Sequence, residues 1–259
     1  MEKEGSFLSR EALLGALGNC ADSLDVRVLD SVDSTNTEAK RMVADGCETR
    51  TLIAARSQSG GRGRMGRSFY SPEGTGAYFS VLYRPVASVD AAVTVTCASS
   101  VAVMRAIRRL TGRACAIKWV NDLYLDEKKV CGILTECVSR GDASYIIVGI
   151  GINIRTSFEG TELAPIAGSI GEGSLSASVL IAEVVRELLP ILDAPWDRGW
   201  LEEYRDCSLV LGKRITFLQN GEAREAIARS IDADGALIVE CDGGEIQRLF
   251  TGEISLKMQ

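Results

Sequence analysis

The sequence predicts an α+β protein in which a central β-sheet flanked by helices is followed by a small all-β module. The first 211 residues contain apolar runs of strand length and apolar runs of helix length. Past Gly212 only short segments remain, separated by Asn-Gly, Asp-Gly and Gly-Gly dipeptides that favour hairpin turns. We therefore expect a main domain at residues 1–211 and a C-terminal β domain at residues 212–259.

Hydrophobic periodicity places the elements of the main domain. Helices are expected at residues 11–19, 38–44, 91–110, 176–191 and 196–207, and strands at residues 26–29, 51–55, 77–83 and 116–120 and within the runs 123–138 and 144–154. Thr35 and Glu38 have capping-box spacing, so we expect them to begin the second helix, and Pro190 marks the end of the fourth. The charged residues 126–129 predict a hairpin turn.

The charge balance excludes whole classes of protein. The chain has 29 Lys and Arg against 35 Asp and Glu, a net charge of −6, which argues against a general nucleic-acid or membrane-surface binder. It has no histidine. That absence removes Ser-His-Asp and Cys-His catalysis and histidine metal sites. Any chemistry must use carboxylates, lysines, arginines, backbone amides or an oxygen-bound metal.

The eight cysteines contain no C-x-x-C pair, so we expect neither a zinc ribbon nor a disulfide scaffold, but buried reduced thiols in a cytoplasmic protein. Residues 1–9 are polar and charged rather than an apolar signal segment. The longest uncharged helical stretch, residues 91–104, is too short and too polar to cross a bilayer. No membrane attachment is expected.

A Gly/Arg-rich loop at residues 59–68 is the most unusual local feature. Its segment 61–66 fits G-x-G-x-x-G, but the residues that follow are a poor helix start, which argues against a dinucleotide-binding turn. Glycines let the backbone approach a ligand, and Arg62, Arg64 and Arg67 add forked cations, so the loop suits a phosphate or a carboxylate. An RNA-binding loop is the alternative, which the acidic net charge disfavours.

The end of the strand at residues 116–120 carries a cation, an amide and a carboxylate. Because side chains alternate along a strand, we expect Lys118 and Asp122 on one face and Trp119 and Asn121 on the other.

Two further segments carry candidate functional residues. Lys128 is expected to be a solvated surface lysine, whereas Lys129 directly precedes the buried-looking residues 130–134. Residues 149–153 end a strand in two glycines and an amide, which is compatible with a β-bulge.

Seven motifs, in order, resemble the biotin protein ligase family (biotin–[acetyl-CoA-carboxylase] ligase). They are DSTN at 33–36, Q-x-x-GRGR-x-GR at 58–67, SP at 71–72, KW-x-ND at 118–122, K-x-x-GIL-x-E at 129–136, GIGIN at 149–153 and GEISL at 252–256. Each motif is weak alone, but the ordered set spans nearly the whole chain. The resemblance implies a mixed central sheet of the class II synthetase type and a C-terminal SH3-like barrel.

The resemblance also implies a reaction. Biotin and ATP would form biotinyl-5′-AMP and pyrophosphate, and the biotinyl group would then pass to a lysine of a biotin carboxyl carrier domain of a carboxylase. Such chemistry needs no histidine. It needs neutralisation of the charge on the biotin carboxylate, the α-phosphate and the leaving pyrophosphate. Mg²⁺ is expected, held by phosphates and water rather than by a protein cage.

By the same resemblance the site residues fall into three sets. Biotin would be bound by Ser34, Thr35, Asn36, Gln58, Arg62, Gly63, Arg64 and Lys129. ATP and its phosphates would be bound by Gly61, Arg67, Asn121 and Asn153. Catalysis would depend on Arg64, on Lys129 as a bridge between carboxylate and α-phosphate, and on Asp122 to orient or deprotonate the acceptor lysine.

The sequence departs from the family pattern at Val120, where many members have proline, and at Phe69, where tryptophan is common. Both changes concern the shape of the pocket. About 30 residues precede the DSTN motif, too few for the helix-turn-helix domain of regulatory members, so the resemblance implies the monofunctional type without DNA binding. Family members often pair through sheet edges, so a homodimer is a further expectation.

Three other functions would share part of this pattern. A lipoate or other acyl-protein ligase uses similar adenylate chemistry, but the Gly/Arg loop and the C-terminal module favour biotin. A non-catalytic biotin-sensing protein would not need the retained Lys129, Asn121 and Asp122. A nucleic-acid-binding barrel at residues 212–259 would need a basic surface, yet acidic residues outnumber basic ones there.

Overall fold

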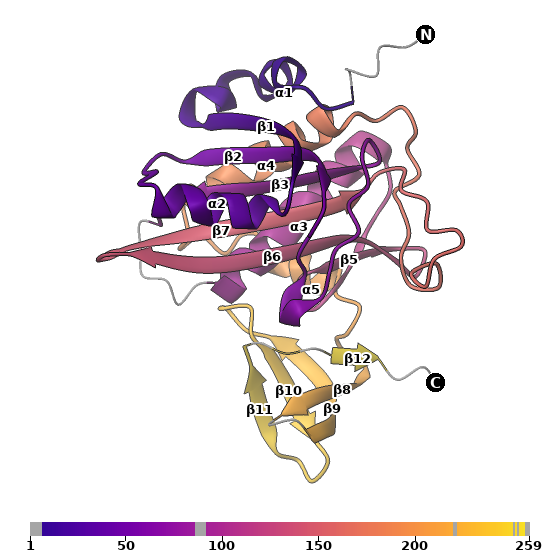
Figure 1. Ribbon diagram of the computed structural model, residues 1–259. Helices are drawn as coiled ribbons and strands as arrows, with labels where there is room; N and C mark the ends of the chain where they lie inside the picture. The colour runs from indigo at the N-terminus through magenta and orange to yellow at the C-terminus, as the bar shows by residue number, and fades with distance from the viewer. Residues whose placement is uncertain (1–6, 86–91, 220–221, 251, 253, 257–259) are drawn as a thin grey trace.

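The main domain is built on one sheet of seven strands (Figure 1). The computed structural model describes residues 7–85, 92–219, 222–250, 252 and 254–256. The strands run in the order β1-β2-β3-β7-β6-β5-β4. β1 and β2 are parallel and all other neighbours antiparallel, so the predicted mixed sheet is confirmed. The strands are β1 (Asp25–Val32), β2 (Thr51–Gln58), β3 (Gly76–Tyr83), β4 (Ala116–Lys118), β5 (Asp122–Leu125), β6 (Lys128–Arg140) and β7 (Ala143–Asn153).

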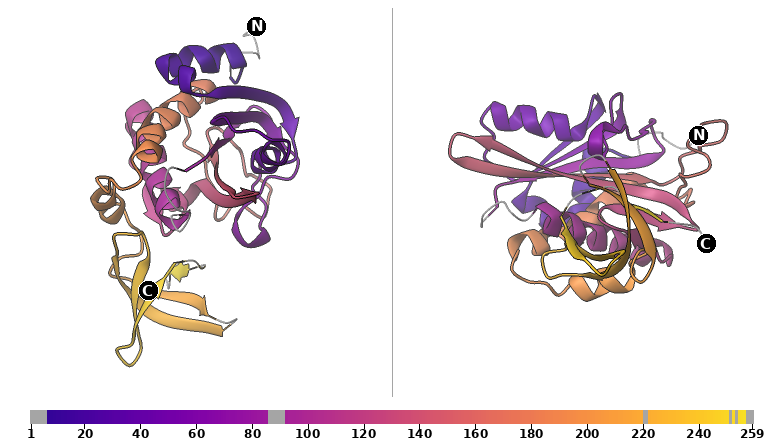
Figure 2. Two further views of the ribbon diagram at one scale, coloured as in Figure 1. Left: turned by 90° about the vertical axis from the view of Figure 1, so that its left-hand side faces the viewer. Right: turned by 90° about the horizontal axis from the view of Figure 1, so that it is seen from below.

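Helices cover both faces of this sheet (Figures 1 and 2). α2 packs on one face, α3 and α4 pack on the other, and α1 lies beside α4. Among the described residues no helix is both long and apolar enough to cross a membrane. The helices are α1 (Arg10–Leu17), α2 (Thr35–Ala44), α3 (Ala92–Thr111), α4 (Ala177–Asp193) and α5 (Leu201–Asp206).

β3 shows how the two-sided burial fixes the sheet. All eight of its residues are buried, because alternate side chains enter different cores. Phe79 and Val81 contribute to the large core with α3 and α4, and Leu82 to the smaller core beneath α2. Burial of one such side chain stabilises the fold by about 1.5–3 kcal/mol. Ser80 lies on the Leu82 face, so a polar group on this strand is held on a rigid support.

The C-terminal domain is a five-stranded antiparallel sheet with the order β11-β10-β9-β8-β12, in agreement with the expected SH3-like fold. Gly235, Gly243 and Gly244 have φ values of 86°, 95° and 84°, which confirms the turns predicted there. The Asn220-Gly221 turn lies outside the described residues. The strands are β8 (Arg214–Gln219), β9 (Glu222–Ile231), β10 (Leu237–Cys241), β11 (Ile246–Leu249) and β12 (Ile254–Leu256).

One turn of this domain docks on the main domain. Trp119 Nε1 donates a hydrogen bond to the carbonyl of Gly235 at 2.9 Å, and Thr94 Oγ1 donates to the carbonyl of Asp234 at 2.8 Å. The indole group is buried, so this bond satisfies a donor that would otherwise be costly to hide. Because Trp119 directly precedes residues 120–122, the domain contact and the polar segment of the KW-x-ND motif belong to one stretch of chain.

Several boundaries differ from those predicted. α2 begins at Thr35, its N-cap is Ser34, and Ser34 makes no side-chain capping bond, so the capping box is wrong. The reason is that the Thr35 hydroxyl contacts β3 instead of its own helix. α4 continues past Pro190 to Asp193, because burial of Leu192 stabilises a last turn that proline does not forbid. α5 is shorter than predicted, and Trp196, 73% exposed, lies before it.

The cysteines are all unpaired, as expected, but only four of them are buried. Burial raises the pKa of Cys97 and of Cys115 to about 12. These thiols are therefore inert at neutral pH. Cys137 is exposed on β6, so the prediction of buried thiols is wrong for that residue.

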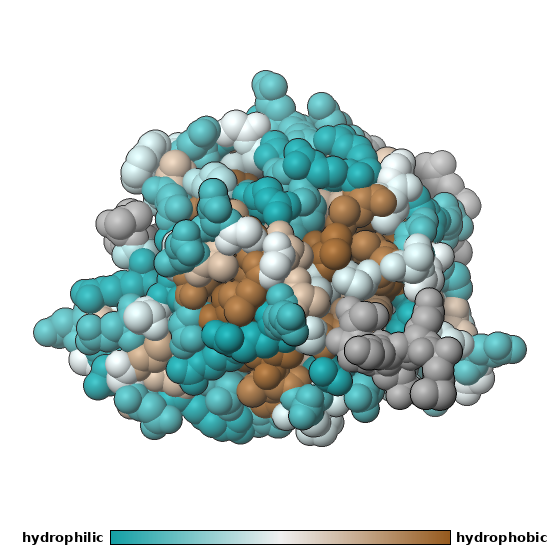
Figure 3. Space-filling model, turned by 90° about the horizontal axis from the view of Figure 1, so that it is seen from above, coloured by the Kyte–Doolittle hydropathy of each residue, from teal (hydrophilic) through white to brown (hydrophobic). Residues whose placement is uncertain are grey.

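Apolar side chains also gather on the surface seen from above, the side of α1. There they form several separate patches that lie among polar residues (Figure 3).

Candidate active site

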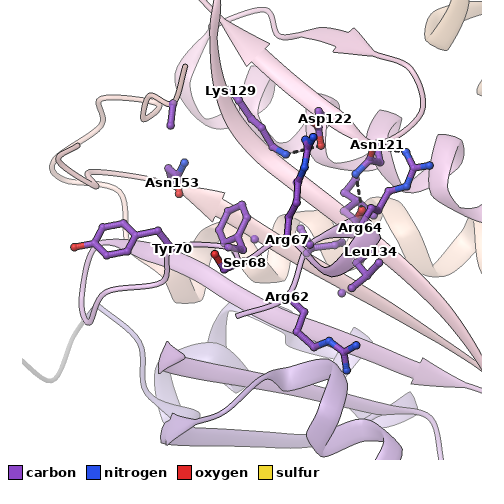
Figure 4. Close-up of a pocket in the computed structure, with 18 of the residues that line it drawn as sticks. Arg62, Arg64, Arg67, Ser68, Tyr70, Asn121, Asp122, Lys129, Leu134 and Asn153 are labelled. Carbon is purple, nitrogen blue, oxygen red and sulfur yellow. Dashed lines mark hydrogen bonds and ion pairs between the residues drawn. The ribbon is translucent and has the colours of Figure 1, made fainter. Parts of the chain in front are cut away.

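A cavity of about 390 Å³ lies beside the N-terminus of α2 (Figure 4). Residues at the start of α2 form its polar end, and residues of the β5–β6 hairpin form its charged end. The loop after β2 forms one side. Every predicted site residue except Gly61 lines it. The lining residues from the prediction are Ser34, Thr35, Asn36, Gln58, Arg62, Gly63, Arg64, Arg67, Asn121, Asp122, Lys129 and Asn153.

The Gly/Arg loop is closed by its own backbone. The Gly63 N–H donates to the carbonyl of Arg67 at 2.7 Å, and the Phe69 N–H donates to the carbonyl of Gly61 at 2.8 Å. A Cβ on Gly61 would lie 2.4 Å from the Phe69 carbonyl oxygen, so this glycine allows close chain packing rather than ligand contact. Gly61 does not line the cavity, and its predicted contact with phosphate stays a prediction. The next regular element is β3, which agrees with the argument against a dinucleotide turn.

Arg64 joins the loop to both domains. Its Nη1 donates to Asn121 Oδ1 at 3.0 Å, and its Nη2 donates to the carbonyl of Gly252 in the C-terminal domain at 2.9 Å. The Arg62 guanidinium points away from this group in Figure 4. The two arginines thus extend to different parts of the cavity wall.

Lys129 and Asp122 form an ion pair in which Nζ lies 2.7 Å from Oδ1 (Figure 4). The two side chains are 33% and 22% exposed, so the pair is half-buried in the cavity wall. Lys129 is therefore not an ordinary surface lysine. Its neighbour Lys128 is not one either, since its Nζ donates to the carbonyls of Ala164 and Pro165. The prediction of a solvated Lys128 is wrong, because that lysine fastens a loop over the cavity.

The strand predicted through Asp122 ends earlier. β4 stops at Lys118, residues 119–121 form a turn, and Asp122 begins β5 opposite Lys118. The predicted alternation of faces across 118–122 is therefore wrong. Asn121 donates from Nδ2 to the carbonyl of Ile133 at 2.9 Å, so its Oδ1 is turned toward Arg64. Without a turn here, Asn121 and Asp122 could not both line the cavity.

The end beside α2 is a network of neutral groups and one ion pair. Asn36 Nδ2 donates to Glu136 Oε2 at 2.9 Å and to the Leu134 carbonyl at 3.1 Å, and Lys40 Nζ lies 2.7 Å from Glu136 Oε1. Burial of Glu136 disfavours its charge, but the bonds from Lys40 and Asn36 outweigh that cost and lower its pKa. The carboxylate is therefore ionised at neutral pH.

Gln58 continues this network toward the loop. It accepts from the Thr35 N–H at 2.9 Å, and its Nε2 donates to Ser71 Oγ at 2.9 Å. Both ends of its amide are thereby fixed.

The glycines of β7 make room for the cavity wall. A Cβ on Gly149 would lie 2.1 Å from Asn36 Oδ1, and one on Gly151 would lie 2.5 Å from the Phe69 ring. β7 pairs with β3 and β6 without a register shift, so the bulge reading is wrong. Phe69 also packs edge-on against Tyr78, with ring centroids 6.4 Å apart, and so forms part of the wall.

Asn153 ends β7 in the cavity wall. Its Nδ2 donates to the carbonyl of Gly168 at 3.0 Å, whereas its buried Oδ1 accepts no hydrogen bond from the described residues. A buried acceptor of this kind is suited to a ligand, a water molecule or a cation.

Sequence reasoning missed several contributors. Ser80 and Glu136 were not predicted as site residues, although Ser80 is the one polar residue of an otherwise apolar strand and Glu136 ends a quoted motif. The loop residues Phe158, Leu163 and Ile166 also line the cavity, and they carry no local signal. Gly252 and Ile254 reach it from the C-terminal domain.

Comparison with known proteins agrees with this geometry. The model of the Biotin/lipoate A/B protein ligase family matches residues 28–153, and that of the Biotin protein ligase C terminal domain matches residues 210–257. The chain is 37% identical to biotin--[acetyl-CoA-carboxylase] ligase of Paracoccus denitrificans over 84% of its own length and 95% of that protein. It is 31% identical to the bifunctional ligase/repressor BirA of Escherichia coli over 97% of its own length and 78% of that protein.

Solved structures show the same fold. Biotin protein ligase from Aquifex aeolicus in complex with biotin and ATP superimposes with a TM-score of 0.77 at 26% identity, covering 91% of this chain and 99% of that one. Biotin protein ligase from Leishmania major in complex with biotinyl-5-AMP gives a TM-score of 0.61 at 27% identity, covering 87% and 98%.

Proposed function

This chain belongs to the biotin protein ligase family, and we propose that it activates biotin with ATP as biotinyl-5′-AMP and transfers the biotinyl group to a lysine of a biotin carboxyl carrier domain. The observation that carries the proposal is the shape of one cavity, in which a neutral hydrogen-bonding end and a cationic end face each other across apolar walls. Biotin has a polar ring system at one end and a carboxylate at the other.

The neutral end would hold the ureido ring. Ser34, Thr35, Asn36 and Gln58 converge there, and the Ser34 side chain is not used to cap α2. Buried, prearranged donors and acceptors orient a ligand at little cost in entropy. The apolar wall made by Phe69 and its neighbours would then take the alkyl chain.

The cationic end would hold the reacting groups. Lys129 would contact the biotin carboxylate and the α-phosphate, and its present partner Asp122 would be released to orient or deprotonate the acceptor lysine. Arg64, with the Arg62-Gly63 backbone, would hold the carboxylate and close over the adenylate, while Arg67 and Asn121 would contact phosphate. Fixed cations at this point neutralise the repulsion between two anions that must come into contact.

Mg²⁺ fits this end of the cavity. Asn153 offers a buried oxygen that accepts no hydrogen bond from the described residues, and oxygen is the ligand that Mg²⁺ prefers. Among the described residues no group of three acidic or cysteine side chains could hold a metal ion, so phosphates and water would supply the other ligands. The ion would neutralise phosphate charge.

Three broader features are also proposed. The chain would divide into two domains at residues 1–211 and 212–259, which is supported by the family match that begins at residue 210. A homodimer would use β1, since segment 207–209 already pairs with the opposite edge strand β4. Eight unpaired cysteines support a reducing compartment such as the cytoplasm.

Pyrophosphate exchange into ATP tests the activity. Exchange should depend on biotin and not on lipoate or octanoate, and adding a biotin carboxyl carrier domain should then consume the adenylate and give a biotinylated lysine. Exchange driven by lipoate or octanoate alone would identify an acyl-protein ligase instead. Biotin binding without any exchange would identify a binding protein.

A further inference from the structure

The direction of the hydrogen bonds at the neutral end can be worked out from its fixed members. Asn36 Nδ2 faces two groups that can only accept, the Leu134 carbonyl and the ionised Glu136 carboxylate. Its Oδ1 must therefore face the other way, where Ser80 Oγ lies 2.6 Å away. An amide oxygen has no proton, so Ser80 must donate its single proton to Asn36.

That assignment fixes Thr35 as well. Ser80 Oγ lies 2.7 Å from Thr35 Oγ1, and since the serine proton is already committed to Asn36, any proton between the two hydroxyls comes from the threonine. Its other neighbour, Gln58 Oε1 at 3.3 Å, is also only an acceptor. In either arrangement the Thr35 proton goes to the protein. Thr35 lines the cavity, so it can offer a ligand only lone pairs.

Glu136 fixes the direction of these hydrogen bonds because it orients the Asn36 amide. Its carboxylate is held by Lys40 at 2.7 Å and is one of the two acceptors that orient Asn36. Neither Glu136 nor Ser80 lines the cavity, and Ser80 is fully buried. Both act on a ligand only through Asn36 and Thr35.

We propose that Glu136 and Ser80 are positioning residues that hold Thr35 as a hydrogen-bond acceptor, and so select a ligand ring that presents an N–H at that point. The inference rests on the proposed function, because the ureido ring of biotin has an N–H on each side of its carbonyl. A ring oxygen in the same place would face the Thr35 lone pairs and be rejected.

Two cyclic carbamate analogues of biotin, each with one ureido N–H replaced by oxygen, test this order. Calorimetry on the wild-type protein should show that one isomer binds at least about 100-fold more weakly than biotin, because two acceptors then face each other. In Ser80→Ala the Thr35 proton keeps only the 3.3 Å contact with Gln58, so it can turn to the ring oxygen. The ratio of the dissociation constant of that carbamate to that of biotin should fall about tenfold, which is the equivalent of one hydrogen bond.

The ratio separates positioning from a merely structural role. Loss of packing would weaken biotin and the carbamate together and leave the ratio unchanged, and that result would overturn the proposal. Ser99→Ala is the matched control, since it removes another fully buried serine hydroxyl, which donates to the Val95 carbonyl within α3. Wild-type protein that bound both carbamates as well as biotin would also overturn it. Wild-type protein that failed to bind biotin would instead refute the proposed function.

Glu136→Gln tests whether Glu136 fixes the direction of these hydrogen bonds. Lys40 should keep the Gln oxygen, which leaves the Gln NH₂ opposite Asn36 Nδ2, and the Asn36 amide loses its fixed orientation. The ratio should fall several-fold, as for one weakened hydrogen bond. The double variant Lys40→Met/Glu136→Gln frees the Gln oxygen to accept from Asn36, so discrimination should recover. A wild-type ratio in Glu136→Gln, or no recovery in the double variant, would overturn the role of Glu136.

Discussion

The two ends of the cavity are built on opposite principles. At the end beside α2, uncharged groups that line the cavity are hydrogen-bonded to Ser80 on β3 and to the Glu136 carboxylate on β6, and Ser80 is fully buried. At the other end, Lys129 pairs with Asp122 in half-exposed positions, and Arg64 reaches across a loop to Asn121 and Gly252. On the proposed function, recognition would use a fixed pattern of donors and acceptors, whereas catalysis would use charges whose present partners can be exchanged for substrate anions.

The largest effect is expected at the charged end. Lys129→Ala should lower kcat/KM for adenylate formation by the equivalent of roughly 2–5 kcal/mol of transition-state stabilisation, because the half-buried cation that would contact the carboxylate and the α-phosphate is lost. Pyrophosphate exchange measures it. Lys128→Ala is the adjacent control and removes a cation that binds only the carbonyls of a loop. An equal loss of pyrophosphate exchange in the two variants would show that Lys129 has only a structural role.

The second effect concerns retention of the intermediate. Arg64→Gly removes both the bond to Asn121 and the bond to the C-terminal domain, so biotinyl-5′-AMP should escape and label bystander lysines at least about tenfold more, as one charged hydrogen bond would account for. Streptavidin blots of added albumin measure it. Met65→Gly, at the 68% exposed tip of the same loop, controls for loop flexibility. Labelling that rises equally in the control would show that flexibility, not the guanidinium, matters.

The third effect tests the rigidity of the neutral end. Gly149→Ala would place a Cβ 2.1 Å from Asn36 Oδ1, so it should cost about 1–3 kcal/mol of unfolding free energy and weaken biotin binding. Chemical denaturation and calorimetry measure both. Gly173→Ala meets nothing within 4 Å and has no positive φ, so it should change neither. Unchanged biotin affinity in Gly149→Ala would mean that this end can adapt.

The smallest effect is a dependence of stability on pH. The folded pKa of Glu136 lies below its ordinary value of 4.5, despite burial, because Lys40 and Asn36 bond to the carboxylate. A lowered folded pKa adds stability above the unfolded pKa, and this stability is lost as the pH falls through the folded value. The Tm difference between wild type and Glu136→Gln should therefore be largest at neutral pH and shrink in acid. A difference that grew in acid would contradict this account.

Sequence reasoning succeeded where the signal is local. Strand and helix positions followed from periodicity, and all but one of the site residues predicted from the ordered motifs line the cavity. It failed where a contact between residues far apart in sequence determines how a side chain is oriented. Thr35 has capping-box spacing, yet its hydroxyl turns to Ser80, 45 residues away. Lys128 and Lys129 are neighbours with similar surroundings in sequence, and only the loop at residues 164–167 and Asp122 separate their roles.

The composition and the motifs limit the chemistry that is possible: the chain has no histidine, three arginines among glycines, and a set of motifs typical of the family. How those groups are coupled depends on the fold. Hydrogen-bond direction depends on which acceptors lie within about 3 Å of a donor, and Asn36, Ser80 and Glu136 are brought to that range by separate elements of one sheet and the helix on it. No spacing along the chain encodes that geometry, because it arises from burial on both faces of the sheet.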